Sequence, residues 1–447
     1  MNATHERRRI NDTATLPVSR SVPLCVLLIS ACSFESPALE SAQTVPRAAA
    51  DPAGARSVAA SMLAEPETLP AATHKEEEQQ YHGRTLAEWR VLLKEVSYDD
   101  PAISELVPGL IAIVKDREQA PWYSRRQAAV ALGRIGEPAV NAVPVLTGLL
   151  SEEAADSGES TKLWTIKALS LFGPLAADAT PELVRLLQDP SQPPLPRLAA
   201  VEALGRIGPA HPDALPAVIE VLENPAEVED GEAFKRRVAA AEILELVGES
   251  AAPAIPALLR AAGNQSVLLR RAAVNTLGMI GPPAEPAVST LVDSMIFDDS
   301  QEVRDLAAVA LGRIGGSGEQ ALAQLLTDPE VEVRRRAAVG LDQLTAASPA
   351  TVRQLKAATD DDALTVRIAA ARALWTATAD SELVVPVALH GLTAEDRETR
   401  MQAVLLLEQV GRSARPWTPE LLALAEDMQA HVRQAARRAL RAVQPNQ

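Results

Sequence analysis

The chain has 447 residues with 43 Lys or Arg and 59 Asp or Glu, which gives a formal net charge of −16. Proteins that track the phosphates of nucleic acids normally carry a clustered basic surface, so this charge argues against a nucleic-acid partner. Aromatic residues make up only 3% of the chain. Together with the lack of sustained alternation between polar and apolar residues, this scarcity argues against a β-sheet core.

Residues 1–32 have the plan of a secretory signal, with three arginines at 7–9, an apolar segment at 21–31 and then Cys32. The end of this segment, Ile-Ser-Ala-Cys, resembles a bacterial lipobox, which implies that Cys32 is diacylated and becomes the first residue of the mature protein. We therefore expect an exported protein, anchored by lipid on the periplasmic side of the cell-envelope membrane. An ordinary cleaved signal, or a cytoplasmic protein in which the segment is no signal, are the alternatives. Cys25 is the only other cysteine.

Residues 33–80 are rich in Ala, Pro, Glu, Ser and Thr and show no helical period, so we predict a disordered tether. A helical domain is predicted to fill residues 81–447. Thr85 and Glu88 form a capping-box pattern at the start of its first helix, which we expect to cap the first repeat.

A basic residue recurs ten times in the rest of the chain, with leucine seven residues later in every copy and alanine three residues later in nine copies. These positions share one face of a helix, which a glycine ends in seven copies. An apolar segment, such as 179–189 or 417–427, precedes each copy, and Thr180 and Thr418 are predicted to cap these first helices. Two-helix units of ~33 residues bury their apolar stripes only by stacking, so we predict an all-α solenoid of about ten units. The repeated basic residues are Arg125, Lys162, Arg197, Arg237, Arg270, Arg304, Arg334, Arg367, Arg400 and Arg433.

Over residues 84–443 this pattern resembles the HEAT repeat family, in particular the short HEAT-like units of phycobilisome lyase relatives. The resemblance implies a right-handed-type α-solenoid with terminal capping helices and a ladder of Asp and Arg side chains between adjacent repeats. The sequence carries the ladder residues six positions apart, at Asp156/Lys162, Asp298/Arg304, Asp328/Arg334, Asp361/Arg367 and Asp427/Arg433. Asn264/Arg270 is a weaker version of the pair. The acid is missing in the other four units, and long turns at 190–196 and 225–236 are expected to shift or break the ladder there.

The sequence contains no HExxH, Walker, GxSxG or CxxC motif, and its six histidines lack ligand spacing, so we predict no metal, no cofactor and no small-molecule substrate. The expected function is a non-catalytic scaffold that binds another protein. Its resemblance to HEAT-like bilin lyases leaves a lyase-type enzyme or an enzyme-associated subunit as the alternative. A HEAT-like DNA glycosylase, which acts on nucleic acid, is the weaker rival.

Aromatic side chains are the predicted partner contacts, because exposed Trp and Tyr often mark interaction surfaces. Trp375 follows the repeat leucine directly and so points off the core stripe, while Trp122 and Tyr123 lie in the turn of the first complete unit. Trp164 is predicted to belong to the core. Four arginines on the last helix, at 433, 437, 438 and 441, are predicted to form a polar cap, with an anion or partner site as the alternative.

Overall fold

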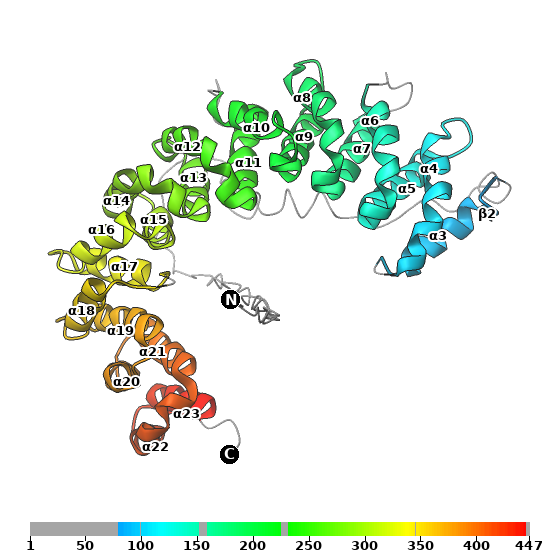
Figure 1. Ribbon diagram of the computed structural model, residues 1–447. Helices are drawn as coiled ribbons and strands as arrows, with labels where there is room; N and C mark the ends of the chain where they lie inside the picture. The colour runs from blue at the N-terminus through cyan, green and yellow to red at the C-terminus, as the bar shows by residue number, and fades with distance from the viewer. Residues whose placement is uncertain (1–78, 99, 152–158, 225–230, 345, 444–447) are drawn as a thin grey trace, which may run out of the picture. The chain divides into compact units, whose positions relative to one another are not determined.

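The computed structural model describes residues 79–443, apart from residues 99, 152–158, 225–230 and 345 (Figure 1). The chain divides into two units, Met1–Thr68 and Leu69–Gln447, and all described residues belong to the second. The predicted export segment, Cys32 and nearly all of the tether therefore lie outside the described residues. None of the described helices is long and apolar enough to cross a bilayer.

A small hairpin precedes the helices, with β1 (Gln80–Tyr81) antiparallel to β2 (Arg84–Thr85). The sequence did not predict it, and it is the only strand pairing in the described part of the chain. Helix α3 (Leu86–Glu95) follows at once, and its predicted capping box is confirmed: the Thr85 hydroxyl accepts a hydrogen bond from the Glu88 N–H, and the Glu88 carboxylate accepts one from the Thr85 N–H. The buried Trp89 indole donates to the Tyr81 carbonyl at 3.0 Å, which joins the helix to the hairpin.

Ten helical pairs then follow in chain order and form two layers, which confirms the predicted all-α solenoid (Figure 1). Each second helix packs on the first helix of its own unit and on the second helices of its neighbours. The first helices are α4 (Val107–Lys115), α6 (Val143–Leu150), α8 (Thr180–Gln188), α10 (Ala214–Glu223), α12 (Ile255–Ala262), α14 (Val288–Phe297), α16 (Ser317–Leu325), α18 (Pro349–Ala358), α20 (Ser381–Leu392) and α22 (Thr418–Ala425). The second helices are α5 (Trp122–Ile135), α7 (Glu159–Phe172), α9 (Pro194–Ile207), α11 (Glu232–Val247), α13 (Val267–Ile280), α15 (Gln301–Ile314), α17 (Val331–Leu341), α19 (Leu364–Thr378), α21 (Arg397–Val410) and α23 (Ala430–Val443).

The repeat leucines form the centre of the core. Nine of the ten are buried, and the tenth, Leu440 on α23, is half-buried because no further unit covers it in the described chain. Glycine stands eight residues after the basic residue in four units and allows the second helices to approach closely. At Gly278, an added Cβ would lie 2.9 Å from the Cβ of Ala310 on the next second helix. The second helices therefore form a tightly packed layer.

The first helices of six units follow a 3-10 segment directly, which the sequence did not predict. Because of this, the threonine caps predicted at Thr180 and Thr418 are wrong: Ala179 and Trp417 occupy the N-cap positions, and neither provides a side-chain cap. The Thr418 hydroxyl instead donates back to the Arg415 carbonyl at 2.8 Å. The 3-10 segments are η1 (Pro101–Leu106), η2 (Glu137–Ala142), η3 (Gly173–Ala179), η5 (Gly248–Ala254), η6 (Pro282–Ala287) and η7 (Gly411–Trp417), and η4 (Gly208–Ala210) lies between α9 and α10.

Candidate partner-binding surface

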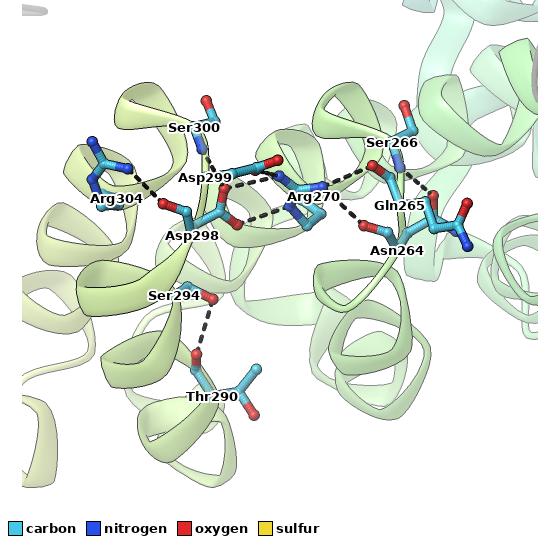
Figure 2. A network of polar contacts seen from close by, with 10 residues as sticks. All are labelled: Asn264, Gln265, Ser266, Arg270, Thr290, Ser294, Asp298, Asp299, Ser300 and Arg304. Atoms are coloured by element: carbon cyan, nitrogen blue, oxygen red, sulfur yellow. Dashed lines mark hydrogen bonds and ion pairs between the residues drawn. The ribbon is translucent and has the colours of Figure 1, made fainter.

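The repeated arginine joins adjacent units, as the contacts of Arg270 show (Figure 2). Its Nε and Nη2 atoms donate to the two carboxylate oxygens of Asp298 in the next unit, at 2.8 and 2.9 Å. Its Nη1 atom donates to the carbonyls of Asn264 and Gln265 in its own turn, at 3.0 and 2.9 Å. The Arg270 and Asp298 side chains are only 10% and 6% exposed, so this bidentate pair is largely shielded from water.

Arg334 repeats this arrangement, with bonds of 2.8 and 2.9 Å to the Asp361 carboxylate of the next unit and 2.9 Å to the Asp328 carbonyl. The hydrogen bonds from Arg334 outweigh the effect of burial and hold the pKa of Asp361 below its ordinary value. Both arginines thus donate to the backbone carbonyl of the residue six positions earlier. Their remaining N–H groups donate to the carboxylate of an Asp in the next unit.

Among the described residues, three further ladder arginines show the backbone contact without the carboxylate pair. Arg304, Arg367 and Arg433 each donate from Nη1 to the carbonyl of the Asp six residues earlier. Lys162 instead donates to the Gln192 side chain at 3.1 Å, and its predicted partner Asp156 lies outside the described residues.

The ladder changes where the turns are longer. Arg197 donates from Nε to the carbonyl of Leu187 at 3.0 Å, and Arg237 donates to the carbonyl of Leu222 at 3.1 Å. Both carbonyls belong to the first helix of the same unit, so these arginines reach back along their own unit. The ladder is therefore a structural device that holds turns and units together.

The second helices also present a continuous surface, which we call the second-helix face. We define it by the side chains five and nine residues after each repeated basic residue, one helical turn apart. All twenty of these residues, from Val130 and Arg134 on α5 to Arg438 and Ala442 on α23, are at least partly exposed. Each of these side chains lies at least partly outside the core, so a partner can reach the face in every unit.

The face carries exposed apolar side chains in the middle of the array. Leu246 on α11 is 72% exposed and Met279 on α13 is 42% exposed, and both stand nine residues after the repeated arginine of adjacent units. Leu405 on α21 is exposed at the five-residue position. Exposed apolar side chains at equivalent positions of adjacent repeats are suited to contact with another protein.

The first two units carry a cluster of cations around one aromatic ring. The Arg126 guanidinium lies 3.4 Å from the centre of the Trp164 ring, and the Lys167 Nζ atom lies 4.4 Å from it. Burial, together with the charge of Arg126, lowers the pKa of Lys167 to about 8, against the opposing effect of Glu202. Trp164 is half-buried, so its predicted place in the core is only partly correct.

The three aromatic residues predicted as partner contacts have different environments. Trp122 begins α5 and is 44% exposed. Tyr123 is buried, with its ring 5.7 Å edge-on from Trp122 and the Arg90 guanidinium 5.9 Å from its centre, so a partner cannot reach it. Trp375 on α19 is half-buried against the core. Of the three, Trp122 offers the most surface.

The last described helix, α23, carries charge where the other second helices have apolar surface. Four residues after the basic residue, nine units have Ala, Val or Ile, which pack between second helices, but α23 has Arg437. Arg437 lies 3.7 Å from Glu426, and Arg438 binds Glu408 of the preceding second helix at 2.6 Å. These arginines give the end of the solenoid a polar surface, as the capping interpretation expects.

Chemistry-bearing groups are dispersed in the described part of the chain. No group of three His, Cys, Asp or Glu side chains there could hold a metal ion. The described histidines lie on separate elements: His82 in the hairpin turn, His211 before α10, His390 on α20 and His431 on α23.

A family model described as HEAT repeats matches residues 149–233, 228–312 and 288–375, which together span just over half of the chain. No curated protein sequence matches significantly. Among solved structures, a chain of the Kap95:Nup1 complex has a TM-score of 0.50 at 16% identity, over 80% of this chain and 55% of that one. YibA of Escherichia coli has a TM-score of 0.33 at 21% identity, over 65% of this chain and 99% of that one. Human deoxyhypusine hydroxylase has a TM-score of 0.26 at 22% identity, over 77% and 98%.

Proposed function

Because the chain belongs to the HEAT repeat family, we propose that it is a non-catalytic scaffold that binds another protein along its second-helix face. The observation that carries this proposal is the unbroken exposure of that face across all ten units, with Leu246 and Met279 in its middle. Side chains that the repeat does not need for its own packing are free to be selected for contact with a partner.

A catalytic role finds less support in the described residues. Their polar side chains are used mainly in the ladder and in turns, and no group of three His, Cys, Asp or Glu side chains among them could hold a metal ion. The lyase-type and nucleic-acid-acting alternatives have no such group of residues to favour them here.

The proposal also includes a cellular location. The signal pattern of residues 1–32 supports export, and its lipobox-like end supports a lipid on Cys32. Residues 33–78 would then connect the membrane surface to the solenoid, which would present its second-helix face on the periplasmic side.

The test is affinity capture from membrane extracts of the native host, with the full-length protein as bait. Changing Leu246 and Met279 together to Glu should remove the specific partner, because two charges would replace apolar contact surface. Leu422→Glu is the matched control, since Leu422 is 54% exposed on the first helix α22. If the double variant and the control retain the same partners as the wild type, the second-helix face is not the binding surface.

A further inference from the structure

The start of the second-helix face differs in charge from the rest of the molecule. In the first three units, the positions five and nine residues after the basic residue, together with the adjoining position one helical turn earlier, hold four cations and one acid. The cations are Arg126, Arg134, Lys167 and Arg206, and the acid is Glu202. In a chain of net charge −16, this grouping of four cations with one acid favours anionic groups at this end of the array.

The cations at these three positions in later units are mostly neutralised by the protein itself. Arg271 pairs with Glu302, Arg335 with Glu332, Arg372 with Asp342 and Arg438 with Glu408. In the first three units, Glu202 pairs with Arg206 at 3.1 Å. Lys167, by contrast, contacts the Trp164 ring and makes no ion pair with any described residue.

Trp164 gives this charge a fixed geometry. The residue two positions after the basic residue is alanine in five other units, so the large ring at this position is not a requirement of the repeat. Its contacts hold Arg126 of α5 and Lys167 of α7 on one ring, 3.4 and 4.4 Å from its centre. Two cations that repel each other and are partly desolvated gain most from a carboxylate that approaches both.

We propose that Arg126, Trp164 and Lys167 form the recognition site for an acidic peptide segment of the partner protein. This inference rests on the proposed scaffold function and names the chemistry of the partner. The carboxylates of the segment bind Arg126 and Lys167, and its aliphatic or aromatic parts pack on the exposed part of Trp164. Arg134 and Arg206 extend the favourable field on either side of the site.

An acidic peptide fits this surface better than a nucleic acid does. A nucleic acid needs a continuous track of cations for its successive phosphates. Here the basic surface ends after the third unit, because α11 presents Glu242 and Glu245 to the same layer. A short acidic segment fits within the first three units and meets no repulsion from the fourth.

The test is fluorescence anisotropy with the whole protein and a labelled glutamate-rich peptide, compared with a matched peptide in which glutamine replaces glutamate. Wild type should bind only the acidic peptide, and Lys167→Gln and Arg126→Gln should each weaken binding by about tenfold. Arg313→Gln is the matched control, since Arg313 is an exposed cation on the same face in the sixth unit. Circular dichroism and thermal unfolding of each variant separate loss of binding from loss of fold.

The pH dependence gives a second and independent readout. The charged groups that face Lys167 are Arg126 from α5 and Glu202 from α9. Because Lys167 of the free protein loses its proton above about pH 8, affinity should fall above that pH by about tenfold in all, the same loss as expected for Lys167→Gln. Lys167→Arg should keep the affinity and lose this pH dependence, since arginine stays protonated.

Equal binding to wild type and Lys167→Gln would overturn the proposal. So would binding of a single-stranded oligonucleotide of equal charge as tightly as the peptide, which would indicate a general polyanion surface. If the peptide fails to bind while the Leu246 and Met279 double variant still loses its captured partner, the acidic-segment inference fails and the scaffold function stands.

Discussion

Replacing Arg270 by alanine should loosen the array at one defined junction. The change removes two hydrogen bonds to Asp298, one to the exposed Asp299 and two to the turn carbonyls of Asn264 and Gln265. Asp298 would then remain a buried carboxylate, 6% exposed, with the Ser300 N–H as its remaining donor among the hydrogen bonds described here. Breaking a buried ion pair from one side typically costs about 3 to 5 kcal/mol, and we expect a loss in this range.

The neighbouring residue supplies the control. Arg271 contacts Glu302 on α15 at 3.5 Å, but the Glu302 side chain is 55% exposed. An exposed pair of this kind contributes at most about 1 kcal/mol, so Arg271→Ala should change little. The two variants remove the same side chain from adjacent positions and differ mainly in the burial of the partner.

Native-state hydrogen exchange with mass spectrometry is the suitable measurement, because long repeat arrays depart from two-state unfolding and a single unfolding free energy is poorly defined. Peptides from α13 and α15 report the local opening free energy at the junction. A loss for Arg270→Ala within 1 kcal/mol of that for Arg271→Ala would show that the ladder does not stabilise the array.

The same pair predicts an acid dependence. Burial alone would raise the pKa of Asp298, but hydrogen bonds from Arg270 and Ser300 outweigh it and hold the pKa below its ordinary value. The pair therefore stabilises the fold fully above the ordinary aspartate pKa of about 4 and loses its contribution as the pH falls through the lower folded value. Protection of α13 and α15 should fall in this acid range in wild type and change less in Arg270→Ala.

Three further changes test the core, the helix spacing and the anchor. Leu311→Ala should lower the local opening free energy of α15 by about 2 to 5 kcal/mol in native-state hydrogen exchange, because Leu311 is fully buried, and a loss below 1 kcal/mol would refute its place in the core. Gly312→Ala should cost about 1 to 3 kcal/mol, because its methyl group would meet the backbone of α17, whereas Gly148→Ala on α6 has open space around it and should be neutral or stabilising by up to about 1 kcal/mol. Equal effects in thermal unfolding would contradict this account of the spacing. A fatty-acid analogue should label the wild type in a host that processes lipoproteins and should not label Cys32→Ser, and label that survives the substitution would rule out the predicted lipid site.

The repeat itself was predictable because it is written as periodicity. Leucine seven residues after each basic residue marks the buried face, and the structure places nine of the ten in the core. The hairpin and the 3-10 segments were not predictable in this way. Two-residue strands are too short to show a period, and a 3-10 segment that runs into a helix shares its pattern of apolar residues.

Single residues at the site were harder to place than the repeat. Trp122 and Tyr123 are adjacent in the sequence, yet Trp122 is exposed and Tyr123 is buried, because their side chains leave the first turn of α5 in different directions. Trp164 was expected in the core because tryptophan is mostly apolar. Its nearness to Arg126 depends on the register between α5 and α7, which cannot be deduced from the sequence of either helix alone. Lys167, three residues after Trp164, was the one sequence signal of a basic surface.

Comparing the units with one another separates residues that stabilise the fold from residues that are available to bind a partner. Residues that recur in every unit, such as the leucines and the ladder arginines, have their side chains occupied by packing or by turn carbonyls and so have little capacity left for a partner. A residue that differs from its counterparts in the other units is not needed for this packing. Examples are Trp164, where five other units have alanine, and the exposed Leu246 at the nine-residue position. Departures from the repeat on an exposed face are therefore where binding specificity should be sought, and they concentrate here on the second helices α7, α11 and α13.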